Sequence, residues 1–255
     1  MAVMPDLNKA NRQVCDVDIR ILKTGEPFLN FETANTTTAG LSSDSVYAMA
    51  KGSRRIAFPN PIEGTMTIEA QVYPFKFFSL LSDGVIESTG AYASHMTIKA
   101  TEANKLPLKI DNGTIVDDKV FVYPKGKFGD SASMIEATYA ENEISAESGI
   151  DAEAEYEVGF IVSRESGVQV ISFNNKKLPQ DYYITMSTLD KDEEGGFTPF
   201  LMTAYKASIQ RSFELSFSSE GDPASVSLTF DLMEDKEGRV LDFAEINEEL
   251  TVNAD

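Results

Sequence analysis

The sequence predicts a mainly β protein, an antiparallel β-sandwich or barrel with one short packed α-helix and long loops. Apolar and polar residues alternate in 209–217 and again in 226–232, which is the pattern of a strand with one buried and one wet face. Turn-forming residues fill 218–223 between the two runs, so we expect an antiparallel pair. The polar face of this pair is rich in hydroxyl and carboxyl groups and offers no catalytic set.

Strands are also expected in the first half of the chain. Residues 14–22 and 28–31 read as a strand pair around the turn residues 24–27. A loop rich in Thr and Ser is expected at 35–45. Alternation is clear in 65–72, where apolar residues are interleaved with Thr, Glu and Gln, so this segment is expected to form a strand with a polar face.

One helix is expected, at 74–83. Pro74 suits the first turn of a helix, and Gly84 stands where a C-terminal cap belongs. Between them, Phe and Leu side chains recur at helical spacing. A helix this short needs tertiary packing to form, so we expect it to lie against one face of the sheet.

The second half of the chain continues as strands and turns. Asn112-Gly113 predicts a hairpin turn, 145–157 an acidic loop or irregular edge, and 190–196 a charged loop. Further strands are expected at 95–100, 106–110, 120–123, 156–162, 168–173 and 182–188.

Composition excludes several classes of protein. The 255 residues carry 41 acidic and 22 basic side chains, a net charge of −19, which argues against wrapping nucleic acid. With one histidine, His95, and one cysteine, Cys15, neither a Ser-His-Asp site nor a zinc site is expected, and no internal disulfide is possible. No apolar run approaches the roughly 20 residues that span a bilayer, and no secretory signal is expected at the N-terminus. We therefore expect no enzyme, no cofactor, no metal and no membrane contact.

This order of elements resembles the major tail proteins, or tail tube proteins, of tailed bacteriophages. The resemblance rests on an early strand pair, a long loop with Gly and Pro, and an extended strand that leads into the aromatic and leucine-rich segment 75–81. It also rests on the closing pair, 213–217 and 225–228. Proteins of that family form hexameric rings that stack into a tube, and DNA passes through the lumen.

The resemblance implies roles for particular residues. An acidic, polar lumen would not grip phosphates, and the wet strand faces supply Glu69, Gln71, Glu214 and Asp231 for such a lining. The segment 35–61 is expected to be an extended loop that reaches a neighbouring subunit, where Arg54, Arg55 and Phe58 would make contacts.

The resemblance also implies an organisation and partners. We expect one tail-tube-like domain over 1–255, with room for an inserted subdomain at 88–155 and an acidic C-terminal tail at 235–255. The expected partners are further copies of the chain, other tail proteins such as the tape measure, terminator and baseplate, and passing DNA that is not bound specifically. The expected location is the tail of the virion, after assembly in the host bacterial cytoplasm.

Two other interpretations stay open from the sequence. A head decoration or tail-terminator protein would give capsid binding or closed rings rather than tubes. A carbohydrate-binding or hydrolytic β-sandwich would require aromatic platforms and a carboxylate pair in a cleft, and the absence of Trp weakens it.

Overall fold

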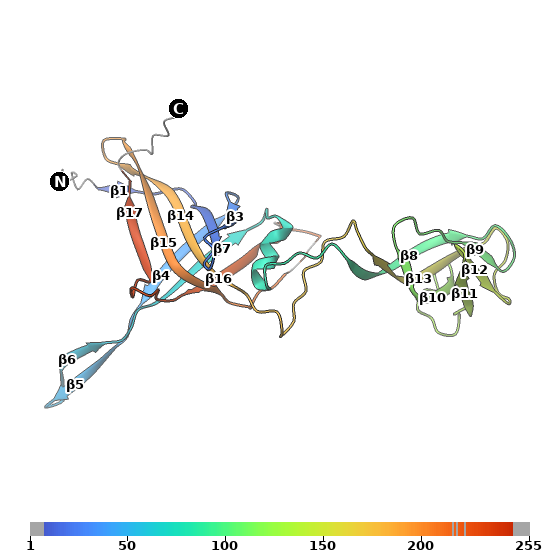
Figure 1. Cartoon of the computed structure of the whole chain (residues 1–255), viewed down its shortest axis with the longest axis horizontal. Helices are drawn as coiled ribbons and strands as arrows, with labels where there is room; N and C mark the ends of the chain where they lie inside the picture. Colours follow the sequence, from blue (N-terminus) through green and yellow to red (C-terminus); the bar gives the residue numbers. More distant parts are fainter. Residues whose placement is uncertain (1–7, 216, 218, 222, 247–255) are drawn as a thin grey trace. The chain divides into compact units, whose positions relative to one another are not determined.

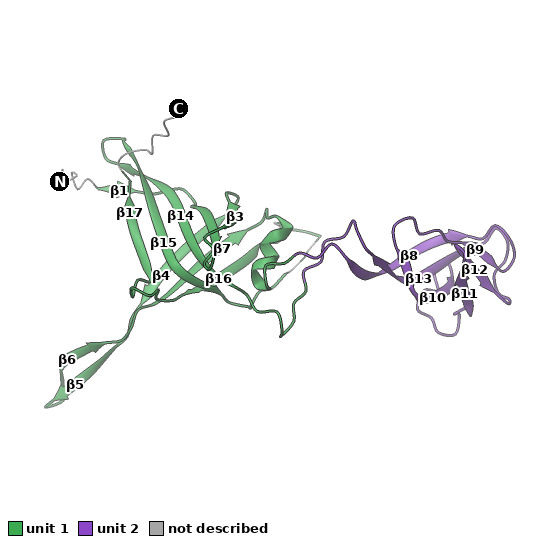
Figure 2. Cartoon of the chain, viewed as in Figure 1, with its two compact units in different colours: residues 1–85, 172–255 green, residues 86–171 purple. Residues whose placement is uncertain are grey.

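The computed structural model describes residues 8–246 except 216, 218 and 222. The chain divides into two compact units, residues 1–85 with 172–255 and residues 86–171 (Figure 2). Both are built from antiparallel strands, in agreement with the mainly β fold predicted. The expectation of one domain over 1–255 did not include this division. The inserted subdomain expected at 88–155 lies within the second unit.

The first unit is organised around one nine-stranded antiparallel sheet (Figure 1). Its main path runs through β3 (Pro27–Phe31), β2 (Asp16–Ile21), β14 (Asp181–Asp192), β15 (Phe197–Ile209), β16 (Val226–Leu232), β7 (Glu63–Ala70) and β4 (Thr36–Ser42). Two short strands join this path, because β1 (Lys9–Ala10) pairs with β14 and β17 (Leu241–Glu245) pairs with β15. β3 and β4 are therefore the two edges of the path, each paired along one side only in the described part of the chain.

Alternation along the strands separates a core face from a polar face. On β7 and β16 every second residue is buried, from Gly64 to Ala70 and from Val226 to Leu232. The predicted helix is present as a 3₁₀ helix, η1 (Phe75–Leu81), which supplies Phe77 and two leucines to the same core. The ring of Phe77 stacks on that of Phe31 with centroids 5.0 Å apart. The helix therefore covers the apolar face of the sheet and leaves the other face open.

The second unit has its own core between two small sheets. One sheet has the order β10 (Thr114–Pro124), β13 (Glu155–Arg164) and β8 (Gly90–Lys99). The other has the order β11 (Ala137–Ala140), β12 (Glu143–Ala146) and β9 (Lys105–Pro107).

The prediction of a strand over 209–217 is wrong. β15 ends at Ile209, and the described residues of 210–217 lie outside strands. β16 forms as predicted, but it pairs with β15 at only three positions and with β7 along its whole length. Alternation identifies a strand without identifying its partner, and here the apolar side chain of Phe213 packs on the rings of Phe78 and Phe173 instead. Residues 216, 218 and 222 lie outside the described part.

Several other local predictions differ from the structure. The loop expected at 35–45 contains β4, whose threonines suit a half-exposed strand paired with β7. Asn112-Gly113 does not join a hairpin, because β9 pairs with β12 and β10 pairs with β13. The segment 168–173 contributes only a bridge from Val170 to Glu87. Within the acidic tail expected at 235–255, β17 is part of the sheet, and 247–255 lie outside the described residues.

Between β4 and β7 the chain forms a separate two-stranded hairpin of β5 (Ser45–Ala50) and β6 (Ser53–Pro59). Its turn is Lys51-Gly52, and both residues have positive φ, at 51° and 81°. A two-residue turn of this kind matches the right-handed twist of the strands that it joins. The segment 35–61, expected to be an extended loop, therefore consists largely of β4 and this hairpin.

Candidate functional site: a polar sheet face and an apolar hairpin

The open face of the sheet is polar where β7 and β16 lie side by side. The facing pairs are Glu69 with Ser227, Thr67 with Thr229, and Thr65 with Asp231. All six side chains are hydroxyls or carboxylates, and the Thr67 and Thr229 Oγ1 atoms are 3.1 Å apart. Opposite residues of an antiparallel pair share a face, so this surface is built from matched polar pairs.

Two of the four predicted lumen residues lie on the same polar face, four register positions apart. Glu69 and Asp231 share the polar face on adjacent strands, and the Asp231 Oδ1 atom accepts a hydrogen bond of 2.7 Å from the Gln210 side-chain amide. Gln71 is exposed just beyond the end of β7, where its backbone amide donates to Asn35 Oδ1 at 2.8 Å. Glu214 is exposed but belongs to no strand, because β15 has already ended.

Polar side chains also line the same sheet at β2 and β14. Arg20 faces Tyr183, Asp18 faces Thr185, and Asp16 faces Ser187. Together with Asn30 and Leu201 these side chains line a shallow depression of about 410 Å³. Arg20 Nε donates to Asp18 Oδ2 at 2.7 Å, so the guanidinium is paired within the face. Sequence reasoning missed this part of the face, although alternation in 16–21 carries the signal.

The edge of the face near β17 is fixed by an aromatic and charged contact. The Tyr205 hydroxyl donates to Asp242 Oδ2 at 2.6 Å, and the Arg239 guanidinium lies 3.8 Å from the Tyr205 ring centroid. Donation to this carboxylate raises the pKa of Tyr205 above its usual range. Arg239 is itself held by Asp235, at 2.7 Å. This network ties β17 to β15 by side chains as well as by the sheet.

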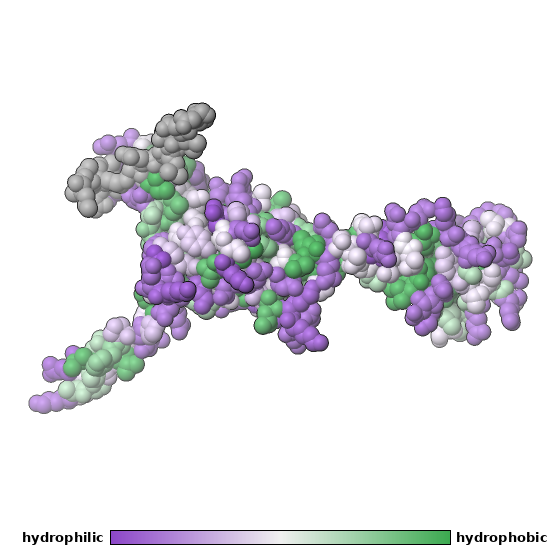
Figure 3. Space-filling model, viewed as in Figure 1, coloured by the Kyte–Doolittle hydropathy of each residue, from purple (hydrophilic) through white to green (hydrophobic). Residues whose placement is uncertain are grey.

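The β5–β6 hairpin carries an apolar face that nothing covers in the described chain. Every residue from Val46 to Pro59 is exposed. Val46 pairs with Phe58 and Ala48 with Ile56, so these four side chains share one face. Figure 3 shows the hydrophobic colour gathered on this hairpin. An isolated two-stranded hairpin is marginal in water and needs further packing, so this face requires a partner.

The three residues predicted to make contacts are all on the hairpin. Phe58 is 56% exposed and belongs to the apolar face. Arg54 lies on the other face, with its guanidinium 4.4 Å from the Tyr47 ring centroid. Arg55 stands at the irregularity in the β5–β6 register. The hairpin thus presents apolar and cationic groups together, which is a composition enriched at protein interfaces.

Other kinds of site are not found in the described residues. No group of three or more His, Cys, Asp or Glu side chains there could hold a metal ion. No helix in the same part of the chain is long and apolar enough to cross a membrane. His95 stacks on Phe128 at 4.1 Å between ring centroids, which gives it a packing role.

A model described as the YomU/Tube protein family matches residues 12–246. The chain belongs to this family. Membership supports the resemblance to phage tail tube proteins and indicates a structural protein of a phage tube. The match spans both compact units and includes the polar face and the hairpin. A comparison with curated proteins gave no match.

Proposed function

We propose that this tube family protein is a non-enzymatic structural subunit that assembles into stacked, hexameric rings forming the tail tube of a phage. The observation that carries the proposal is the exposed apolar face of the β5–β6 hairpin, Val46, Ala48, Ile56 and Phe58. Soluble monomers rarely expose a contiguous apolar surface to water, whereas self-assembly would cover it. The free edges of β3 and β4 offer a second route, because a neighbouring subunit could extend the sheet there.

The polar face supports the role of a conduit. DNA passing through a tube must not be gripped, and binding to phosphates requires Lys and Arg on the surface. Glu69 and Asp231 on the face of β7 and β16 would instead repel the phosphates. The face opposite the helix η1 is therefore our candidate for the lumen, with Gln71 just beyond the end of β7.

The proposal extends to partners and location. The subunit would meet further copies of itself, the tape measure protein within the tube, and terminator and baseplate proteins at its ends. It would be assembled in the host bacterial cytoplasm and function in the virion tail during DNA ejection. A terminator or head decoration protein is the second candidate, because the same apolar hairpin would serve a closed ring or a capsid contact.

Negative-stain electron microscopy over a concentration series tests the proposal. Hollow tubes or stacked rings should appear as the concentration rises, because association is driven by mass action. Single closed rings at every concentration would favour the terminator, and monomers at every concentration would contradict self-assembly. A matched control is the Phe58→Asp variant, which should remain unassembled while keeping its strand content by circular dichroism.

A further inference from the structure

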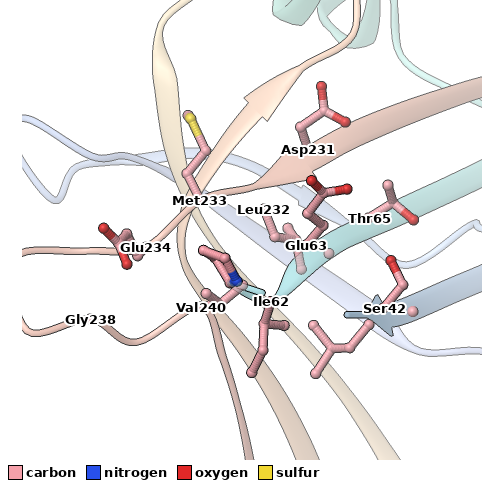
Figure 4. A pocket seen from close by; sticks show the side chains of 14 residues that line it. Ser42, Ile62, Glu63, Thr65, Asp231, Leu232, Met233, Glu234, Gly238 and Val240 are labelled. Atoms are coloured by element: carbon pink, nitrogen blue, oxygen red, sulfur yellow. The ribbon is translucent and has the colours of Figure 1, made fainter. Parts of the chain in front are cut away.

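We propose that the β5–β6 hairpin of one copy docks into a pocket beside Ile62 on a second copy. This inference rests on the proposed self-assembly and names the surface that receives the hairpin. The pocket has a volume of about 790 Å³ and lies where β4 and β16 end and β7 begins (Figure 4). Pockets of roughly 300–1,000 Å³ accept a compact ligand, so this one can admit a few side chains rather than a domain.

Part of the pocket lining is aliphatic. Ile62 is 53% exposed and Leu41 is 45% exposed, so both present aliphatic surface to solvent at the pocket. Leu232, Met233 and Val240 complete the apolar part. Aliphatic side chains gathered around a concave surface suit an apolar partner.

The hairpin supplies a matching apolar surface. Its face of Val46, Ala48, Ile56 and Phe58 has two large side chains on one strand opposite smaller ones on the other. Inserting these groups between Ile62 and the neighbouring aliphatic side chains would remove apolar surface of both copies from water, which favours association.

Charge complementarity selects the hairpin as the occupant. Lys51, Arg54 and Arg55 are the only charged residues from Ser45 to Pro59. The rim of the pocket carries the opposite sign, with Glu63 and Glu234. In a chain with a net charge of −19, a cationic segment is rare, and an acidic rim would repel most of the molecule's own surface.

The short connection between β4 and the hairpin, which we call the neck, indicates that the docking occurs between copies. β4 ends at Ser42 and the hairpin begins at Ser45, so only two residues connect them. After β6, Asn60 is hydrogen-bonded to this connection. Its backbone N–H donates to the Asp44 backbone carbonyl at 2.8 Å, and its backbone carbonyl accepts from Ser43 Oγ at 2.8 Å. A neck this short and hydrogen-bonded cannot fold the hairpin back into the pocket at its own base.

A contact between two different surfaces of the same chain is heterologous. Repeated contacts of this kind close into rings or continue as open filaments, according to the rotation between copies. Either geometry is compatible with a tube of rings. The pocket therefore acts as the acceptor in a repeating contact, and each copy carries one donor and one acceptor.

Site-directed cross-linking tests the contact. A chain with Ala48→Cys on the apolar face is mixed with a chain with Ser42→Cys at the pocket and treated with a short bismaleimide. The wild-type chain is one control, because its lone Cys15 is buried. The other control replaces the pocket variant with Ser212→Cys, an exposed serine outside the pocket. We expect a covalent dimer from the pocket pair, several-fold more abundant than in either control.

Charge exchange gives a second readout on folded protein. Lys51→Glu at the hairpin turn with Arg55→Glu at the register irregularity should weaken the association that permits cross-linking by roughly tenfold, because Arg54 lies on the face opposite the inserted one. Glu63→Lys with Glu234→Lys on the pocket chain should do the same. Combining the two reversed chains should restore the dimer, which general unfolding would not do.

The outcomes separate this inference from the proposed function. Tubes without the specific dimer would overturn the pocket and leave the tube role standing. The specific dimer without tubes would support the pocket contact and count against the tube role. No specific dimer at any concentration, or no restoration by the reversed pair, overturns the docking whether or not tubes form.

Discussion

Two phenylalanines of the first unit should respond in opposite ways to the same substitution. Phe77 on η1 is fully buried, with its ring 5.0 Å from that of Phe31 and 6.0 Å from that of Tyr73. Phe77→Ala should lower the free energy of unfolding by about 3–5 kcal/mol, the usual cost of emptying a buried aromatic site. Phe58 is 56% exposed on the hairpin, so Phe58→Ala should change it by no more than about 0.5 kcal/mol.

For assembly, Phe58→Ala should have the larger effect of the two substitutions. Truncating a central interface aromatic costs about 2 kcal/mol or more in association, so Phe58→Ala should shift assembly to roughly 30-fold higher concentration. Hydrogen exchange of β7 and β14 peptides at a concentration below assembly measures stability in the first unit alone. Sedimentation of the same samples measures association.

Specific results would refute this reasoning. A loss of protection in Phe58→Ala equal to that in Phe77→Ala would mean that the hairpin is packed against its own chain. Unchanged protection in Phe77→Ala would mean that the helix does not close the core. Unchanged assembly of Phe58→Ala would remove the hairpin from the subunit contact.

Three further predictions follow from local geometry. Gly113→Ala should destabilise the second unit by about 1–3 kcal/mol, because φ is +147° and a Cβ atom would stand 2.7 Å from the backbone oxygen of Ser163; thermal melting checks this, and an unchanged midpoint would contradict it. The Lys125 hydrogen bond lowers the pKa of the Glu155 carboxyl, so its stabilisation is present above the unfolded pKa of about 4.3 and is lost as pH falls through the lower folded pKa. Glu155→Gln should therefore lower the melting midpoint at pH 7 and have no effect in strong acid. Glu69→Lys should make assembled tubes bind DNA with affinity that falls steeply with salt, and retention equal to that of wild-type tubes would remove Glu69 from the lumen.

Much of the fold could be predicted from local patterns. The strand pair β2–β3, the strand β7 and the helix next to Pro74 follow from alternation, turn residues and apolar spacing that act within a few residues. Pairing between distant strands could not be read in this way. β16 pairs with β7, about 160 residues away in sequence. Its pairing partner is therefore determined by packing in the core and not by the turn next to it in sequence.

Residue types typical of turns and loops also occur in this chain for other structural reasons. Gly113 follows an asparagine and resembles a hairpin turn, but a side chain there would collide with Ser163 on β13. Its small size serves close approach between backbones. The half-exposed threonines of β4 look like loop residues, because hydroxyl-rich composition is shared by loops and by edge strands.

The placement of the candidate lumen residues on one sheet face follows the sequence pattern for two of the four, and their role stays a prediction. Glu69 and Asp231 lie on one face because both strands keep their alternation and pair in register. Glu214 was placed on the same face by extending β15 beyond Ile209, which the structure does not do. The apolar hairpin was hidden within an expected loop, since its exposure depends on what the rest of the chain fails to cover.

A cryo-electron microscopy reconstruction of tubes assembled from the purified protein tests the central claim most directly. We expect density in which the polar face of β7 and β16 surrounds the lumen, with Glu69 and Asp231 toward its axis and η1 away from it. The β5–β6 hairpin should be covered by a neighbouring copy. A lumen lined by η1, or a hairpin left exposed on the outer surface of the tube, would contradict this account.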